Sequence, residues 1–223
     1  MSYLWCILTM FGTVMVHSSA VHLEHKLMAS EIENDVTQYN FPFVPRSQWG
    51  SRSAKNGTAL VTPVSFVVIH HSHTPSACHT GAECSRAMRS MQDFHMDDRG
   101  WWDIGYNFAV GSDGSAYEGR GWSRMGAHAL HFNSVSIGIC IIGDWRSEVP
   151  PSKQLKTAKA LIQAGVELGY IKPGYKLVAH RQVRDTECPG EALFNEINTW
   201  TQYSSFPSSA KDLNDVPELN KQS

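Results

Sequence analysis

Two histidines and a cysteine stand where they could hold one metal ion. They are His70, His180 and Cys188, and residues 181–187 form a loop long enough to turn back on the same ion. A catalytic zinc ion takes three protein ligands, drawn mostly from imidazole, thiolate and carboxylate groups, and keeps a fourth position open for water. Although a single histidine is usually an ordinary surface or core residue, the trio predicts a zinc site that carries out hydrolysis.

The tandem pair His70-His71 leaves open which imidazole is the ligand. Both follow a short apolar run at residues 66–69 that reads as a buried strand. Successive residues of a strand point to opposite faces of the sheet, so only one of the pair can face a given ion. The periodicity does not select between them.

Cys188 also permits a second chemistry. Cys6 lies in an N-terminal apolar run, Cys78 and Cys84 lie close enough in a polar loop for a local disulfide, and Cys140 sits in an apolar run. Cys188 is then left without a partner. If the apolar N-terminal run is a signal for export, an unpaired cysteine is a candidate ligand or nucleophile. A thiol hydrolase with Cys188 as nucleophile and His180 as base is therefore the alternative.

Short apolar runs predict the strands that must position these groups. A hairpin is indicated by the turn sequence Ser112-Asp113-Gly114 between two strand-like runs. The predicted strands are residues 66–69, 105–110, 115–118, 135–142 and 176–179. Two of them end at His70 and His180, where a rigid sheet can fix ligand geometry.

Helical periodicity fills the gaps between the strands. One helix is predicted after Cys84 and continues to about Asp97, and a second begins after Pro151 with Ser152 as its N-cap and ends at Gly169. A third is predicted over residues 191–203. Together the patterns predict an α/β fold, with a mixed central β-sheet flanked by about three helices.

Length and charge restrict the class of protein. The chain has 223 residues and a formal net charge of -2, which suits one domain and argues against nucleic-acid binding. Residues 1–20 are expected to be a cleaved signal peptide, which predicts a secreted protein, and no later apolar run predicts a transmembrane helix. We expect a flexible segment at 21–40, the domain at 41–203, a polar tail at 204–223, and a monomer.

Eight segments, in order along the chain, match one family. They are RSQWG (46–50), VIHHS (68–72), MQDFH (91–95), WDIGYNF (102–108), YEGRGW (117–122), GAH (126–128), GICIIGDW (138–145) and AHRQVRDTECPG (179–190). Over about residues 42–200 the chain resembles the peptidoglycan recognition proteins, and among them the catalytic insect LB-type amidases. The resemblance implies a mixed sheet with three helices and a groove above it.

The resemblance also implies the chemistry. Zinc would be held by His70, the first of the tandem pair, with His180 and Cys188, and Cys78 would pair with Cys84. The implied reaction is hydrolysis of the amide bond between N-acetylmuramic acid and L-alanine in bacterial peptidoglycan, which down-regulates innate immune signalling by degrading the elicitor. A receptor that binds peptidoglycan without cutting it is the alternative within the family. Such members typically lack the zinc cysteine, which this sequence retains.

Two further residues match catalytic positions of the family. Tyr106 resembles the catalytic tyrosine, whose phenol could orient water or donate a hydrogen bond to the developing oxyanion. Thr186 stands where catalytic animal members often carry threonine, and a hydroxyl there could support the oxyanion. Local hydrogen bonding to the loop backbone is an equal alternative for Thr186.

Substrate contacts are implied at one end of the groove. Gly100-Trp101 resembles the pair in members that prefer meso-diaminopimelate stems, and Arg120 matches the arginine that reads the extra carboxylate of that residue. A guanidinium can bind a carboxylate through two hydrogen bonds, whereas lysine at this position of the stem lacks the extra carboxylate. Positions that contact the glycopeptide in the family are matched by His95, His128 and Asn133.

Overall fold

The computed structural model describes residues 39–217 and 219. The predicted signal peptide and nearly all of the predicted flexible segment at 21–40 lie outside these residues. Within the described part of the chain, no helix is long and apolar enough to cross a membrane.

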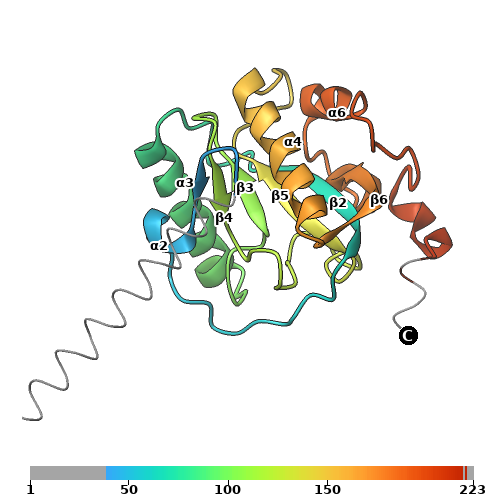
Figure 1. Cartoon of the computed structure of the whole chain (residues 1–223), viewed down its shortest axis with the longest axis horizontal. Helices are drawn as coiled ribbons and strands as arrows, with labels where there is room; N and C mark the ends of the chain where they lie inside the picture. The colour runs from blue at the N-terminus through green and yellow to red at the C-terminus, as the bar shows by residue number, and fades with distance from the viewer. Residues whose placement is uncertain (1–38, 218, 220–223) are drawn as a thin grey trace, which may run out of the picture. The chain divides into compact units, whose positions relative to one another are not determined.

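A six-stranded sheet lies at the centre of the described structure (Figure 1). Its strand order is β1-β4-β3-β5-β2-β6. Every neighbouring pair is parallel except the hairpin pair β3 and β4, so the predicted mixed sheet is confirmed. The strands are β1 (Phe43–Val44), β2 (Val64–His71), β3 (Phe108–Val110), β4 (Ala116–Glu118), β5 (Ser136–Ile141) and β6 (Ile171–Ala179).

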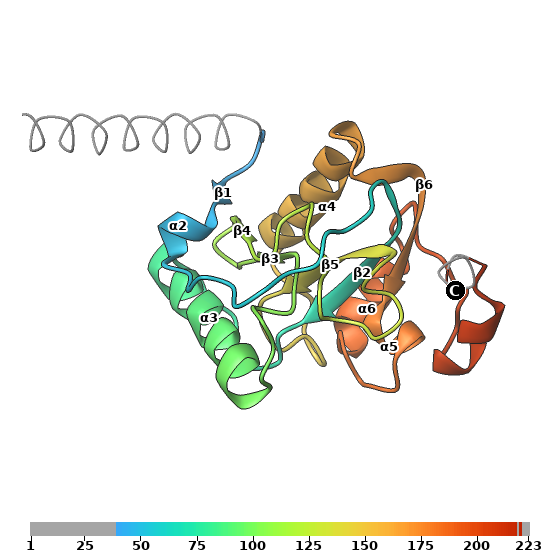
Figure 2. The ribbon, with the colours of Figure 1, turned by 90° about the horizontal axis from the view of Figure 1, so that it is seen from below.

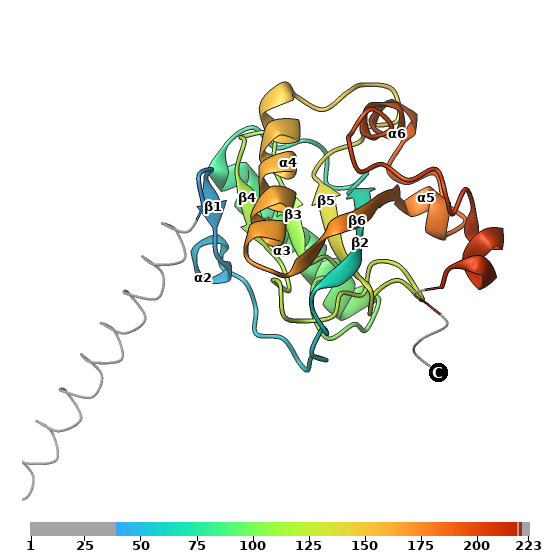
Figure 3. The same cartoon turned by 45° about the vertical axis from the view of Figure 1, so that its right-hand side comes forward.

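Both faces of the central strands are buried under helices, as a parallel sheet requires. Figures 2 and 3 show α4 (Ser152–Glu167) on one face and α3 (Gly81–Asp93) on the other. Val67 and Ile69 of β2 pack in one core cluster with residues of α4 and α6 (Glu191–Ile197), whereas Phe66 and Val68 pack in a separate cluster on the opposite face. Alternation along β2 therefore assigns successive side chains to different layers.

Helix α3 begins at a capping box. The Thr80 hydroxyl accepts the N–H of Glu83, and the Glu83 carboxylate accepts the N–H of Thr80. The helix passes into a π-helical turn, η1 (Phe94–Asp98), close to the predicted end at Asp97. In α4, by contrast, Pro151 occupies the N-cap position and Ser152 is the first helical residue, so the predicted cap at Ser152 is wrong. Proline suits this entry because it has no N–H to satisfy.

The third predicted helix is shorter than expected. It ends at Ile197, because the chain beyond it pairs with the edge strand β6: Leu177 donates its N–H to Gln202 O and accepts from the N–H of Ser204. The sequence patterns do not predict the short elements β1, α2 (Arg46–Trp49) and α5 (His180–Val183).

Ordered structure continues beyond residue 203. A 3-10 helix, η2 (Ala210–Asp215), precedes Val216, which is buried beside Phe66 and Val178. The Gln182 side chain of α5 donates to Ser204 O and Pro207 O. Part of the predicted polar tail is therefore packed against the domain.

Cys78 and Cys84 form a disulfide bond that joins the loop before α3 to its first turns. The bond closes a loop with a sequence separation of 6. Replacing both cysteines with alanine is expected to lower the free energy of unfolding by about 2 kcal/mol, because the open loop regains conformational entropy in the unfolded chain. Urea denaturation followed by tryptophan fluorescence measures this change. An unchanged midpoint in urea would show that the disulfide does not stabilise the fold.

Candidate metal centre and groove

The structure brings the three predicted ligands together. His70 ends β2, and His180 directly follows β6, the parallel neighbour of β2. Because the carboxyl ends of parallel strands meet at one edge of the sheet, the two imidazoles lie side by side with ring centroids 4.3 Å apart. Cys188 returns to them through the loop after α5, which is closed by a hydrogen bond from Arg181 N to Cys188 O.

The spacing of the donor atoms suits one ion. One donor atom each of His70, His180 and Cys188 lies within 4.8 Å of the others. Cys188 Sγ lies 3.9 Å from His70 Nδ1, a separation that two bonds of about 2.0–2.3 Å to a shared zinc ion can span. Sγ also accepts the backbone N–H of His71 at 3.3 Å, which helps to fix the sulfur in place.

Burial keeps both candidate imidazoles neutral. Desolvation, together with the neighbouring His180, lowers the pKa of His70 well below its usual value. Desolvation and the nearby Arg184 lower the pKa of His180 to about 4. Neutral imidazoles present the lone pairs that a metal needs.

Burial raises the pKa of the Cys188 thiol to about 12, so this sulfur needs a bound cation to become a thiolate at neutral pH. Two neutral imidazoles and such a thiol fit zinc.

His71 belongs to the other face of the sheet. Its Nδ1 accepts the N–H of Trp145 at 3.3 Å, and Trp145 packs in the core cluster of the α4 face. His70 instead continues the opposite face, after Phe66 and Val68. The alternation that left the tandem pair undecided therefore favours His70 once the layers are known.

Tyr106 lies beside the candidate metal ligands, just before β3. Its ring centroid is 5.3 Å from that of His70. Burial, with the nearby sulfurs of Cys140 and Cys188, raises the pKa of Tyr106 well above its usual value. The phenol therefore keeps its proton and can act as a hydrogen-bond donor.

Thr186 makes a hydrogen bond to the local backbone, which is one of the two roles expected for it from the sequence. Its Oγ1 accepts the N–H of Cys188 at 3.2 Å. This bond fastens the loop that carries the candidate thiolate ligand. The hydroxyl proton is not used by this bond, so the predicted supporting role in catalysis stays a prediction.

A cavity of about 510 Å³ opens next to the metal centre. His95 and Trp101 line it as a stacked pair, with ring centroids 4.7 Å apart, and His95 Nδ1 accepts the N–H of Gly105. Other sequence-predicted residues in its wall are Tyr106, His128, Asn133 and His180. The wall also contains Leu130 and Arg184, whose spacing in the sequence gives no sign of a site, and Phe94, whose helical spacing predicts a helix but no site.

Arg120 lies in a neighbouring pocket. It lines a smaller pocket of about 280 Å³ with Gly100 and Trp101, and Trp101 is shared with the cavity at the metal centre. Arg120 Nε donates to Ile104 O and Nη1 to Met125 O, so two backbone carbonyls hold the guanidinium. The predicted stem-binding residues Gly100, Trp101 and Arg120 therefore line one pocket, which adjoins the cavity next to the candidate metal centre.

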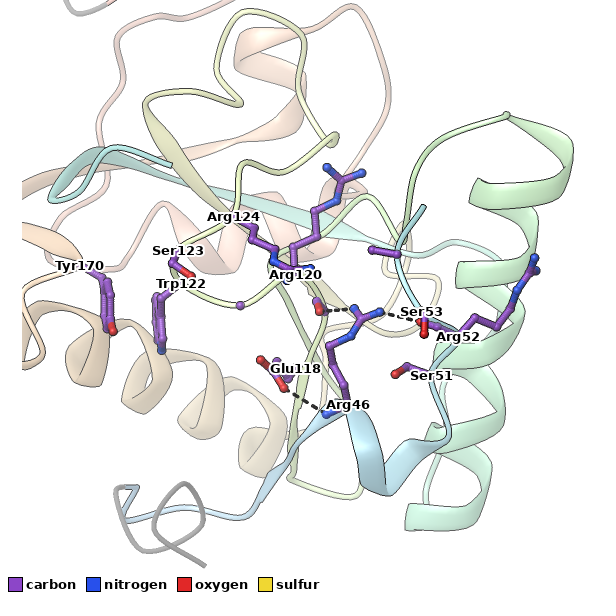
Figure 4. A pocket seen from close by; sticks show the side chains of 13 residues that line it. Arg46, Ser51, Arg52, Ser53, Glu118, Arg120, Trp122, Ser123, Arg124 and Tyr170 are labelled. Carbon is purple, nitrogen blue, oxygen red and sulfur yellow. Dashed lines mark hydrogen bonds between the residues drawn. The ribbon is translucent and has the colours of Figure 1, made fainter. Parts of the chain in front are cut away.

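A separate pocket of about 640 Å³ also borders Arg120 and is shown in Figure 4. Its wall includes Arg46 and Arg124, together with Trp122 and Tyr170. The Arg46 guanidinium is already paired with Asp103 and with backbone carbonyls. This pocket contains no candidate ligand of the metal centre.

The sequence is similar to a family model and to known proteins of related description. The sequence matches the family described as N-acetylmuramoyl-L-alanine amidase over residues 60–191. It is 52% identical to peptidoglycan-recognition protein LB of Drosophila melanogaster over 159 residues, which is 71% of this chain and 68% of that protein.

Two solved structures with bound ligands are also similar. One is a tyrosine-to-phenylalanine mutant of Drosophila PGRP-LB in complex with tracheal cytotoxin, with a TM-score of 0.72 and 51% identity, covering 73% of this chain and 96% of the other. The second is peptidoglycan recognition protein-LE in complex with tracheal cytotoxin, described as monomeric diaminopimelic acid-type peptidoglycan. It has a TM-score of 0.73 and 41% identity, and the match covers 75% and 98% of the two chains.

Proposed function

The chain belongs to the peptidoglycan recognition protein family and to its N-acetylmuramoyl-L-alanine amidases, and on that premise we propose a specific reaction. The enzyme uses zinc to hydrolyse the amide bond between N-acetylmuramic acid and L-alanine in peptidoglycan. The observation that carries the proposal is the cluster of His70, His180 and Cys188 at the edge of a groove. Zinc, when bound, would polarise the scissile carbonyl and lower the pKa of a bound water to about 7.

Residues of the chain would stabilise the developing negative charge and position the glycopeptide. The Tyr106 phenol, protonated because of its burial, donates a hydrogen bond to the oxygen on which negative charge develops. The stacked pair His95 and Trp101 forms a flat wall against which the glycopeptide can lie.

One experiment tests which bond is cut and whether the reaction needs a metal. A purified muropeptide is incubated with the full chain, with and without a chelator, and the products are analysed by mass spectrometry. We expect free stem peptide and intact sugar with zinc present, none after chelation, and recovery when zinc is restored. An intact muropeptide with zinc present would favour the binding-only alternative.

Activity that survives complete metal removal would instead favour Cys188 as a nucleophile with His180 as base. That reading is opposed by the raised pKa of the buried thiol, because only the thiolate is an effective nucleophile.

We further propose a preference for stems that contain meso-diaminopimelate. Arg120→Ala is expected to weaken binding of such fragments about 10- to 100-fold, the equivalent of one lost hydrogen bond to a charged group, and to affect lysine-type fragments less. Calorimetric titration in the Cys188→Ser background, where the ligand would not be consumed, measures both affinities. Arg124→Ala is the matched control, since Arg124 lines the other pocket that borders Arg120 and not the pocket formed with Gly100 and Trp101. Equal weakening for both stems would contradict the carboxylate assignment.

We also propose that the enzyme is secreted and monomeric, and that it dampens innate immune signalling by destroying its elicitor. The disulfide between Cys78 and Cys84 supports an oxidising compartment. Secretion is checked by detecting the processed chain in culture medium. An uncleaved chain retained in the cell would contradict it.

A further inference from the structure

We propose that His128 is a positioning residue that holds the His70 imidazole in place for the metal. This inference rests on the zinc site of the proposed function, and it differs from the substrate contact that the sequence predicted for His128. His128 Nδ1 lies 3.0 Å from His70 Nε2, and the two rings meet edge to face at 82° with centroids 5.0 Å apart. His128 is buried, with 8% of its surface exposed, although its edge also lines the cavity.

The positions of the nitrogens fix the direction of this hydrogen bond. His70 turns Nδ1 toward Cys188 Sγ, so Nδ1 is the nitrogen available to the metal. The ring proton of a neutral His70 must then reside on Nε2, which donates to His128 Nδ1. A metal-binding histidine almost always donates its second ring N–H in this way, and the acceptor fixes both tautomer and ring orientation.

The chain of hydrogen bonds continues behind His128. With Nδ1 acting as acceptor, the proton of a neutral His128 is on Nε2, which faces Ser136 Oγ at 3.5 Å. Ser136 Oγ in turn donates to Phe132 O at 2.6 Å. The donors therefore follow one direction, from His70 through His128 and Ser136 to the carbonyl of Phe132. All three side chains can be neutral in this series.

Two glycines, Gly126 and Gly138, border the His128 ring. A Cβ on Gly138, in the middle of β5, would lie 2.3 Å from a ring carbon of His128, and one on Gly126 would lie 2.4 Å from the same atom. The Asn133 side-chain oxygen accepts the N–H groups of His128 and Ala129, each at 2.9 Å. Two glycines therefore make room for the ring, and Asn133 fixes the loop that carries it.

Zinc affinity measured without substrate tests the proposal, because His128 also lines the cavity. In the full chain, His128→Phe removes the acceptor but keeps a planar ring, and it is expected to weaken zinc binding about 10- to 100-fold in competition with a chromophoric chelator. His128→Asn, whose amide oxygen can replace Nδ1, should bind zinc with an affinity closer to that of the wild type than to that of His128→Phe. His131→Asn is the control: this exposed residue of the same loop has a positive φ of 73° that asparagine tolerates.

A second measurement needs no variant. In the zinc-loaded wild type, nuclear magnetic resonance should show a proton on His70 Nε2 that is coupled across a hydrogen bond to His128 Nδ1. A proton on His128 Nδ1 itself would overturn the proposal, and so would a His128→Phe variant that binds zinc as tightly as the wild type. Failure of the wild type to bind zinc would instead overturn the proposed function, so the two failures are distinguishable.

Discussion

Replacing Cys188 with serine is expected to reduce hydrolysis of muropeptide about 10³-fold or more. A serine hydroxyl keeps its proton at neutral pH and binds zinc far less well than a soft thiolate, so the variant loses the metal. The bound ion is expected to supply several kcal/mol of transition-state stabilisation, and each 1.4 kcal/mol is a factor of ten in rate. Zinc content by atomic absorption and turnover by chromatography of the released peptide measure the two losses.

The same variant should still bind glycopeptide. The groove residues around Arg120 and Trp101 do not touch the sulfur, and Thr186 can still accept the backbone N–H of residue 188. Calorimetric titration and a melting curve serve as controls for folding. If binding is lost together with hydrolysis, Cys188 is chiefly a structural residue; if turnover is retained without zinc, the metal mechanism is wrong.

Tyr106→Phe is expected to lower kcat about 10²- to 10³-fold, the usual effect of removing one donor to a developing oxyanion. Zinc content should not change, since the three candidate ligands stay in place. Tyr117→Phe is the matched control: its hydroxyl donates to Asp113 Oδ2 at 2.7 Å, away from the metal ligands, so only stability should fall. Unaltered turnover in Tyr106→Phe would remove the phenol from the mechanism.

Strong periodic signals in the sequence predicted most of the fold. The β-branched runs and the turn at Asp113-Gly114 gave the sheet its central strands and hairpin. Elements of two to four residues, β1, α2 and α5, are too short to show a period. The end of the third helix could not be predicted because it depends on pairing between residues 202–204 and Leu177, which only the folded chain brings together.

The candidate site was predicted as a set of ligands but not as a hydrogen-bonded assembly. Spacing and residue type were enough to group His180 with Cys188, because the loop between them is short. The choice of His70 over His71 needed either the family resemblance or knowledge of which face α4 covers. The contact between His70 and His128 spans 58 residues and arises from the arrangement of β2 and a distant loop, which no local pattern encodes.

The candidate ligands of the metal centre come from distant parts of the chain, with a sequence separation of 118 between His70 and Cys188. Because an unfolded chain does not hold such groups together, we expect a zinc ion to bind with full affinity only after β6 has docked on the sheet. Once loaded, zinc favours the folded state, because a ligand that binds only the native form opposes unfolding. Metal uptake would therefore report that folding is complete, and catalytic activity would begin only in molecules that have reached that stage.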